Sequence, residues 1–176
     1  MKNRLEEFME KRTFLIDQLD AEKISKTQFI EENFLLIDRL SMVPFRHVVN
    51  YEQALYNYHY YNHLAKYWNN MAQEQKRKNQ KKYQKAWNKS RNYYAEKDKS
   101  IRNMMQLQDM SQVEAYFISM HSKKLQNNLV EIVLKDKKQC ILHTMNPEII
   151  SILNGCGVLE EKERKSLIDS YVNTGY

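Results

Sequence analysis

The stretch YEQALYNYHYYNHLAKYWNNMAQEQ, residues 51–75, decides the fold that we predict for this chain. Small and aromatic side chains alternate in it at spacings of four and three residues, the period of a long helix that packs along one seam. The pattern therefore predicts a helix over residues 51–75. Its seam comprises Ala54, Tyr58, Tyr61, Ala65, Trp68 and Ala72.

A second stretch with the same period follows over residues 80–107. We expect the chain to reverse near Asn79 and the two helices to pack side by side, the rings of one over the small residues of the other. The second seam comprises Tyr83, Trp87, Ser90, Tyr94, Lys97, Ile101 and Met104.

The segment before residue 51 predicts two shorter helices, over residues 3–19 and from Ser25 toward Pro44. Ser25 and Gln28 have the spacing of a capping box, in which each side chain caps the other residue's backbone N–H. Pro44 ends the second helix because the residue before a proline is disfavoured in the α region. We expect the two helices to form an antiparallel hairpin.

After Met110 the pattern changes to short runs of β-branched, aromatic and aliphatic residues, at 113–120, 129–135 and 140–145. Their short connections favour an antiparallel meander. Two helices are expected to follow, one capped by Asn146 and one over residues 160–172. We therefore predict an α+β fold: an N-terminal helical hairpin, a long aromatic helical hairpin, and a three-stranded antiparallel β-meander with two C-terminal helices. Residues 1–110 would be the helical region, with the α/β region 111–176 packed on it as one compact unit.

The charge of the chain is concentrated in one segment. The net charge is +6, but residues 76–99 hold ten basic and two acidic residues, while the remainder holds 18 basic and 20 acidic. An asymmetry of this kind is typical of a binding segment, although a solvated surface is the simpler interpretation. Two cysteines, no apolar leader and no long apolar stretch indicate a cytoplasmic protein that does not enter the membrane.

No constellation of residues predicts a catalytic or metal site, and we expect no cofactor. His59 and His63 project from one face of a helix, but the glutamate of a zincin motif and a third ligand are missing, which favours a packing role. Cys140 and His143 are three apart on a predicted strand and so face opposite sides.

Three tyrosines, Tyr56, Tyr60 and Tyr67, fall off the seam of residues 51–75. We expect these rings to be buried either by the N-terminal hairpin or by a second chain. The hairpin is favoured because its own apolar faces must also pack against another element. Rings that stay exposed would be candidate contacts, since tyrosine and tryptophan are frequent in binding hot spots.

Several segments resemble an uncharacterised family of small Firmicutes proteins, a domain of unknown function. They are the segments at 24–26 (ISK), 29–33 (FIEEN), 61–62 (YN), 65–67 (AKY), 113–118 (VEAYFI), 131–136 (EIVLKD) and 164–169 (RKSLID). The resemblance implies a bacterial cytoplasmic setting and no activity.

Three functional hypotheses follow. The first is a non-enzymatic interaction protein, with a protein partner or a second copy bound on the long hairpin. The second is nucleic-acid binding through the basic segment 76–99. The third is an enzyme with a site near the meander, using His121, His143 or Cys140. The candidate binding residues are Tyr56, Tyr60, Tyr67, Lys78, Lys81, Lys82, Lys85, Lys89 and Arg91.

Overall fold

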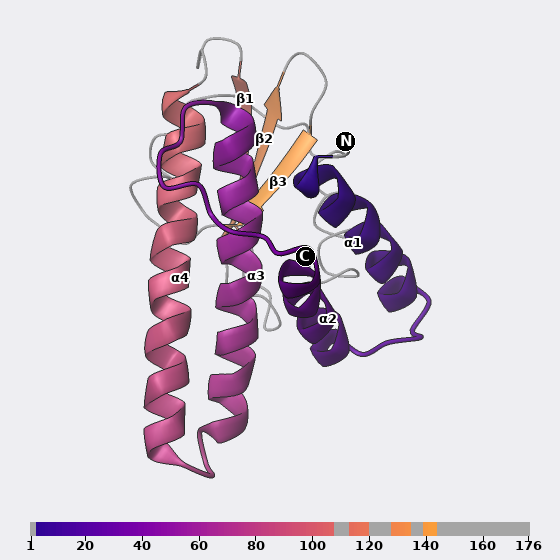
Figure 1. Ribbon diagram of the computed structural model, residues 1–176, viewed down its shortest axis with the longest axis vertical. Helices are drawn as coiled ribbons and strands as arrows, with labels where there is room; N and C mark the ends of the chain where they lie inside the picture. The colour runs from indigo at the N-terminus through magenta and orange to yellow at the C-terminus, as the bar shows by residue number, and fades with distance from the viewer. Residues whose placement is uncertain (1–2, 108–112, 120–127, 135–138, 144–176) are drawn as a thin grey trace. The chain divides into compact units, whose positions relative to one another are not determined.

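A computed structural model describes residues 3–107, 113–119, 128–134 and 139–143 (Figure 1). The chain divides into two compact units, Met1–Ser100 and Ile101–Tyr176. Whether they form one compact body, as expected from the sequence, stays a prediction. The helices are α1 (Arg4–Asp20), α2 (Lys26–Arg39), α3 (Tyr51–Gln75) and α4 (Gln80–Gln106), and the strands are β1 (Val113–Ser119), β2 (Asn128–Leu134) and β3 (Gln139–His143).

The start of α2 is fixed by the predicted capping box. The Gln28 backbone N–H donates to Ser25 Oγ at 3.2 Å, and the Ser25 backbone N–H donates to Gln28 Oε1 at 2.8 Å. Each side chain thus satisfies a backbone donor that the helix itself leaves without a partner. The capping box is confirmed.

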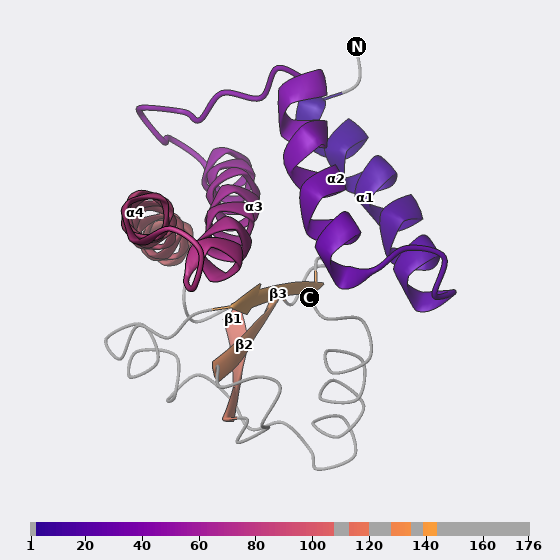
Figure 2. The same cartoon turned by 90° about the horizontal axis from the view of Figure 1, so that it is seen from below.

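The predicted long hairpin of α3 and α4 is also confirmed (Figure 2). The reversal lies at Asn79, whose side-chain oxygen accepts from the Lys82 backbone N–H at 3.0 Å and caps α4. Farther along, Ser90 Oγ donates to the Ala65 carbonyl at 3.0 Å across the interface. Seam residues with 2% exposure or less are Ala54, Tyr58, Ala65, Ala72, Ser90, Lys97, Ile101 and Met104.

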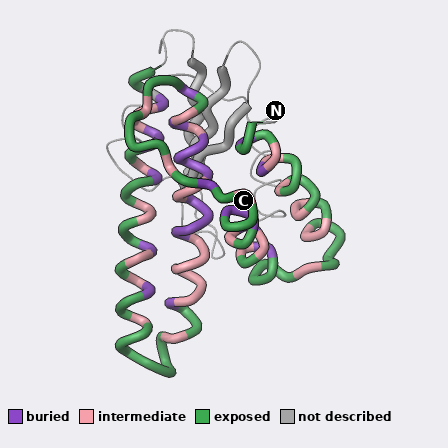
Figure 3. The backbone as a smooth tube through the Cα atoms, viewed as in Figure 1, coloured by how far each residue is buried: buried purple, intermediate pink, exposed green. Residues whose placement is uncertain are grey.

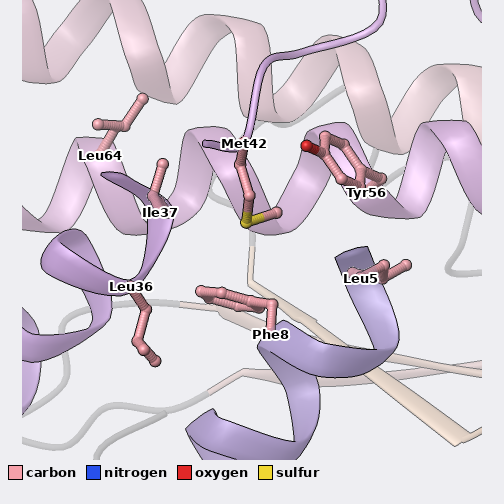
Figure 4. Packing of buried hydrophobic residues seen from close by; sticks show 7 residues of the cluster. All are labelled: Leu5, Phe8, Leu36, Ile37, Met42, Tyr56 and Leu64. Atoms are coloured by element: carbon pink, nitrogen blue, oxygen red, sulfur yellow. The ribbon is translucent and has the colours of Figure 1, made fainter. Parts of the chain in front are cut away.

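The hydrophobic core of the helical unit lies where α1 and α2 meet α3 (Figure 4). Phe8 of α1 is fully buried in it, and Met42 enters from the connection between α2 and α3. The apolar stripes of α1 and α2 therefore cover the side of α3 that carries Tyr56. The cluster consists of Leu5, Phe8, Leu36, Ile37, Met42, Tyr56 and Leu64.

The three strands form one antiparallel sheet in the order β1-β2-β3. In β1 and β2, Val113 is opposite Leu134 and Ser119 is opposite Asn128. In β2 and β3, Ile132 is opposite Cys140. The strands belong to the second unit.

The sequence predicted one α+β fold for the whole chain. This prediction is wrong, because the packed core is all-helical. Residues 3–107 are all-helical, with four helices and no strand, and every residue of the core cluster comes from these helices or the connection between α2 and α3. The physical reason is that α1 and α2 supply enough apolar surface to bury the free side of α3. The core cluster of the helical unit is thus formed by residues of α1, α2, α3 and the connection between α2 and α3.

Part of the sequence prediction falls beyond the described residues. The two C-terminal helices, beginning near Asn146 and residue 160, lie outside them. Among the helices that are described, none combines the length and the apolar content that crossing a lipid bilayer requires.

Candidate binding surface on the helical hairpin

The end of the α3–α4 hairpin carries a cluster of exposed cations around the turn at Asn79. We call this cluster the basic tip. All six of its side chains are exposed, and within the described residues none of them forms an ion pair. The basic tip consists of Lys76, Arg77, Lys78, Lys81, Lys82 and Lys85.

Little negative charge is available to neutralise the basic tip locally. Residues 68–91 contain eight basic residues and one acid, Glu74, a balance of +7. The Glu74 carboxylate accepts a hydrogen bond from the Asn70 side-chain amide at 3.5 Å. The basic tip therefore presents an uncompensated positive field to the solvent, which attracts anions over roughly one Debye length of about 8 Å at physiological salt.

The core packing ends before the basic tip begins. The contact of α2 with α3 includes the ring stack of Phe34 on Tyr67, and the end of the hairpin where α3 turns into α4 extends beyond α2 (Figure 1). Along this end of the hairpin the residues are mostly exposed or half-buried (Figure 3).

Aromatic rings at this end of the hairpin are engaged within the chain. Tyr83 and Trp87 of α4 stack on each other with ring centroids 6.1 Å apart and planes inclined by 22°. The Lys89 ammonium lies over the Trp68 ring of α3, 3.9 Å from its centroid, in a cation–π contact that joins the two helices. All three rings are half-buried, so they serve first to hold the hairpin together.

The three off-seam tyrosines are covered from within the chain, as the favoured alternative predicted. Tyr56 is 5% exposed, and its hydroxyl accepts from the Val43 backbone N–H at 3.1 Å. Burial raises the pKa of its hydroxyl. Tyr60 is half-buried beside the core cluster, and Tyr67 stacks on Phe34. Their role as contacts for a partner stays a prediction, and the structure gives two of them a packing role instead.

His59 and His63 lie in the interior, against Phe8 of α1. The ring centroids of His63 and Phe8 are 5.3 Å apart, and those of His59 and Phe8 are 6.3 Å apart. Burial, reinforced by Arg12 and Lys66, lowers the pKa of His59 to about 3 and that of His63 well below 6.5. Both imidazoles are therefore neutral at pH 7. In the described part of the chain, no third histidine, cysteine or acid joins them as a metal-binding group.

Two lysines, Lys97 and Lys66, lie in environments that lower their pKa values. The concentration of basic residues at 76–99 gave no indication of this. Lys97 is 2% exposed, and its ammonium pairs with the Asp98 carboxylate at 3.1 Å. Burial lowers the pKa of Lys97, and Asp98 partly restores it. Lys66 is half-buried, and burial together with Arg12, Lys26 and Lys97 lowers its pKa to about 7. The seam period placed Lys97 inside the hairpin, whereas no sequence signal marks Lys66.

The residues of the enzyme hypothesis are not brought together within the described backbone. Cys140 and His143 both lie on β3, three residues apart, which is about 10 Å along the strand. His121 lies outside the described residues.

A comparison with family models matches residues 1–176 to a family of unknown function, DUF6648. This confirms the resemblance drawn from the sequence to a family without an assigned activity. Comparison with curated proteins finds no match, and comparison with solved structures finds none either.

Proposed function

We propose that this chain, which belongs to the family of unknown function DUF6648, binds nucleic acid through the basic tip of its α3–α4 hairpin. The observation that carries the proposal is the set of six exposed cations without an ion pair in the described residues. A phosphate backbone is a dense array of negative charge, and each lysine that approaches it releases condensed counterions.

The positions of the lysines on α4 support the proposal. Lys81 and Lys82 precede Lys85 by four and three residues, so these exposed lysines occupy neighbouring positions one turn apart on the helix. At 1.5 Å per residue they recur about every 4.5–6 Å along the axis. Lysines at that spacing can contact successive phosphates of one strand. Binding of a single acidic side chain on a protein partner would not require such a row.

The alternative of a protein partner on the tyrosines has less support. Tyr56 is buried in the core cluster and Tyr67 is stacked on Phe34, so neither ring is displayed in the way that a contact hot spot requires. The predicted lysines Lys78, Lys81, Lys82 and Lys85 of the basic tip, by contrast, are exposed.

Fluorescence anisotropy with labelled 20-nucleotide probes tests the proposal. The panel contains single-stranded and duplex forms of DNA and RNA, with polyglutamate as an anion that lacks phosphate. We expect at least one nucleic acid to bind at 50 mM salt, to outcompete polyglutamate, and to dissociate as salt is raised.

The matched variants have three charges removed each. In the first, Lys78→Gln, Lys81→Gln and Lys82→Gln are combined in the basic tip. In the second, Lys23→Gln, Lys26→Gln and Arg46→Gln remove three exposed charges elsewhere. Loss of binding in the first alone supports the proposal. Equal loss in both, or no binding by the unmodified protein, rejects it.

A further inference from the structure

The outer side of α4 carries four exposed polar residues at spacings of three, four and three positions. Because a helix turns once every 3.6 residues, these side chains lie in one line along its axis. We call this line the outer face of α4. It consists of Lys81, Gln84, Asn88 and Arg91.

The two central residues of the outer face hold each other in place. Gln84 Nε2 donates to Asn88 Oδ1 at 2.9 Å. That bond leaves the Gln84 carbonyl oxygen as an acceptor and both hydrogens of the Asn88 side-chain amide as donors. An adenine edge in the major groove shows the complementary pair, the N7 acceptor and the N6 donor, which asparagine and glutamine characteristically contact.

The two outer residues are cations at the ends of the line. Lys81 and Arg91 are ten positions apart, a distance of about 15 Å along the axis. That length matches about four base pairs at 3.4 Å each. A helix that places amides at its centre and cations at both ends therefore offers base contacts flanked by phosphate contacts.

We propose that the outer face of α4 enters the major groove of double-stranded DNA, with Gln84 and Asn88 on base edges and Lys81 and Arg91 on the flanking phosphates. This inference rests on the proposed nucleic-acid binding and names its substrate. The major groove of B-form DNA admits an α-helix, whereas the major groove of A-form RNA is too narrow for side chains to read.

The rings at this end of the hairpin argue against a single strand as the preferred ligand. Single-strand binding depends on aromatic faces that are open to stacking bases. Tyr83 and Trp87 stack on each other and are half-buried, and Trp68 is capped by Lys89. The exposed groups of the outer face are amides and cations, which suit groove edges and phosphates.

Selection from a random 20-base-pair DNA library, followed by anisotropy on the enriched and shuffled duplexes, tests the inference. We expect an enriched core that contains adenine and a preference over the shuffled duplex of about five- to a hundredfold. The double variant Gln84→Ala/Asn88→Ala loses that preference but keeps the salt dependence. The control Gln73→Ala/Gln106→Ala, which removes two exposed amides elsewhere, keeps both.

The outcomes separate this inference from the broader proposal. Salt-dependent binding without enrichment, or equal affinity for duplex RNA or single strands, overturns the major-groove inference and leaves nucleic-acid binding in place. An enriched core that survives Gln84→Ala/Asn88→Ala also overturns the inference. Absence of binding to every probe overturns both.

Discussion

Phe34 of α2 and Tyr67 of α3 stack face to face, with ring centroids 3.8 Å apart and planes inclined by 8°. This contact turns a tyrosine that the seam of α3 leaves uncovered into part of the junction between the two hairpins. It also marks where packing by α2 gives way to the open end of α3 and α4.

The stack predicts a measurable coupling between the two rings. We expect Phe34→Ala and Tyr67→Ala each to lower the free energy of unfolding by about 1–3 kcal/mol, because each removes a half-buried ring. A double-mutant cycle in urea should give a coupling energy of about 1 kcal/mol. If Tyr67→Ala leaves the urea midpoint unchanged, the ring has no packing role and again becomes a free contact residue.

The buried histidines predict that the protein loses stability in mild acid. Their folded-state pKa values lie below 6.5, so in mild acid these histidines bind protons in the unfolded chain but stay neutral in the folded chain. The stability they contribute is complete above pH 6.5 and declines as the pH falls toward the folded value, about 3 for His59. The slope is at most about 1.4 kcal/mol per pH unit for each histidine.

Urea unfolding at pH 7.5, 6.5, 5.5 and 5.0 measures this slope. We expect His63→Leu to reduce the slope, even if it shifts the midpoint at every pH, because it removes one titrating group. The control His47→Gln, at an exposed site, should leave the slope unchanged. Equal slopes in all three proteins would contradict the assignment of the acid sensitivity to the interior of the helical unit.

For Lys66 we expect that removal of the charged side chain stabilises the fold. Its folded pKa of about 7 lies below the usual 10.5, so folding becomes less favourable as the pH falls through this range. We expect Lys66→Met to raise the urea midpoint at pH 6 and to lose part of that advantage by pH 9, because the folded lysine is then neutral while the unfolded one stays charged up to about pH 10.5. The exposed control Lys99→Met should show no such pH dependence. A lower midpoint for Lys66→Met at pH 6 would show that the ammonium is well accommodated.

Asn57 of α3 anchors the connection between α2 and α3 through two hydrogen bonds to the Phe45 backbone. Its side-chain oxygen accepts from the Phe45 backbone N–H at 2.8 Å, and its amide donates to the Phe45 carbonyl at 2.9 Å. Asn57→Ala breaks both bonds and should cost about 2 kcal/mol of unfolding free energy. Hydrogen exchange should accelerate at the Phe45 amide, while the Ser25 amide, bonded in the capping box, serves as an unaffected control. An unchanged Phe45 rate would contradict this anchoring.

Much of the helical unit could be predicted from local pattern. The four-and-three spacing of Ala54, Tyr58 and Ala65 determines which side of α3 faces α4, and Asn79 supplies the cap at the reversal. The same spacing placed Lys97 inside the hairpin. These predictions succeed because helix faces depend on periodicity within one segment.

The parts that failed depend on contacts between distant segments. The integrated α+β fold was wrong for the packed core because the sequence does not reveal that α1 and α2 alone would bury the side of α3 that carries Tyr56. Burial of Tyr56 is decided by Phe8 and Met42, which lie far from it in the chain. The low pKa of Lys66 likewise arises from burial, together with cations on α1, α2 and α4. For the candidate surface, the composition of the sequence showed where the cations of the basic tip are concentrated. Which side chains are exposed and which rings are buried depends on tertiary packing, which the composition does not show.

The salt dependence of binding to a 20-base-pair DNA duplex tests the central claim most directly. The measurement compares the slope of log Kd against log salt for the unmodified protein with that for the combined variant Lys81→Gln/Lys82→Gln/Lys85→Gln. Each phosphate contact contributes about 0.9 to that slope. The account predicts a slope that is smaller by about 2 to 3 in the variant, with weaker binding at 50 mM salt. An unchanged slope and affinity would contradict it.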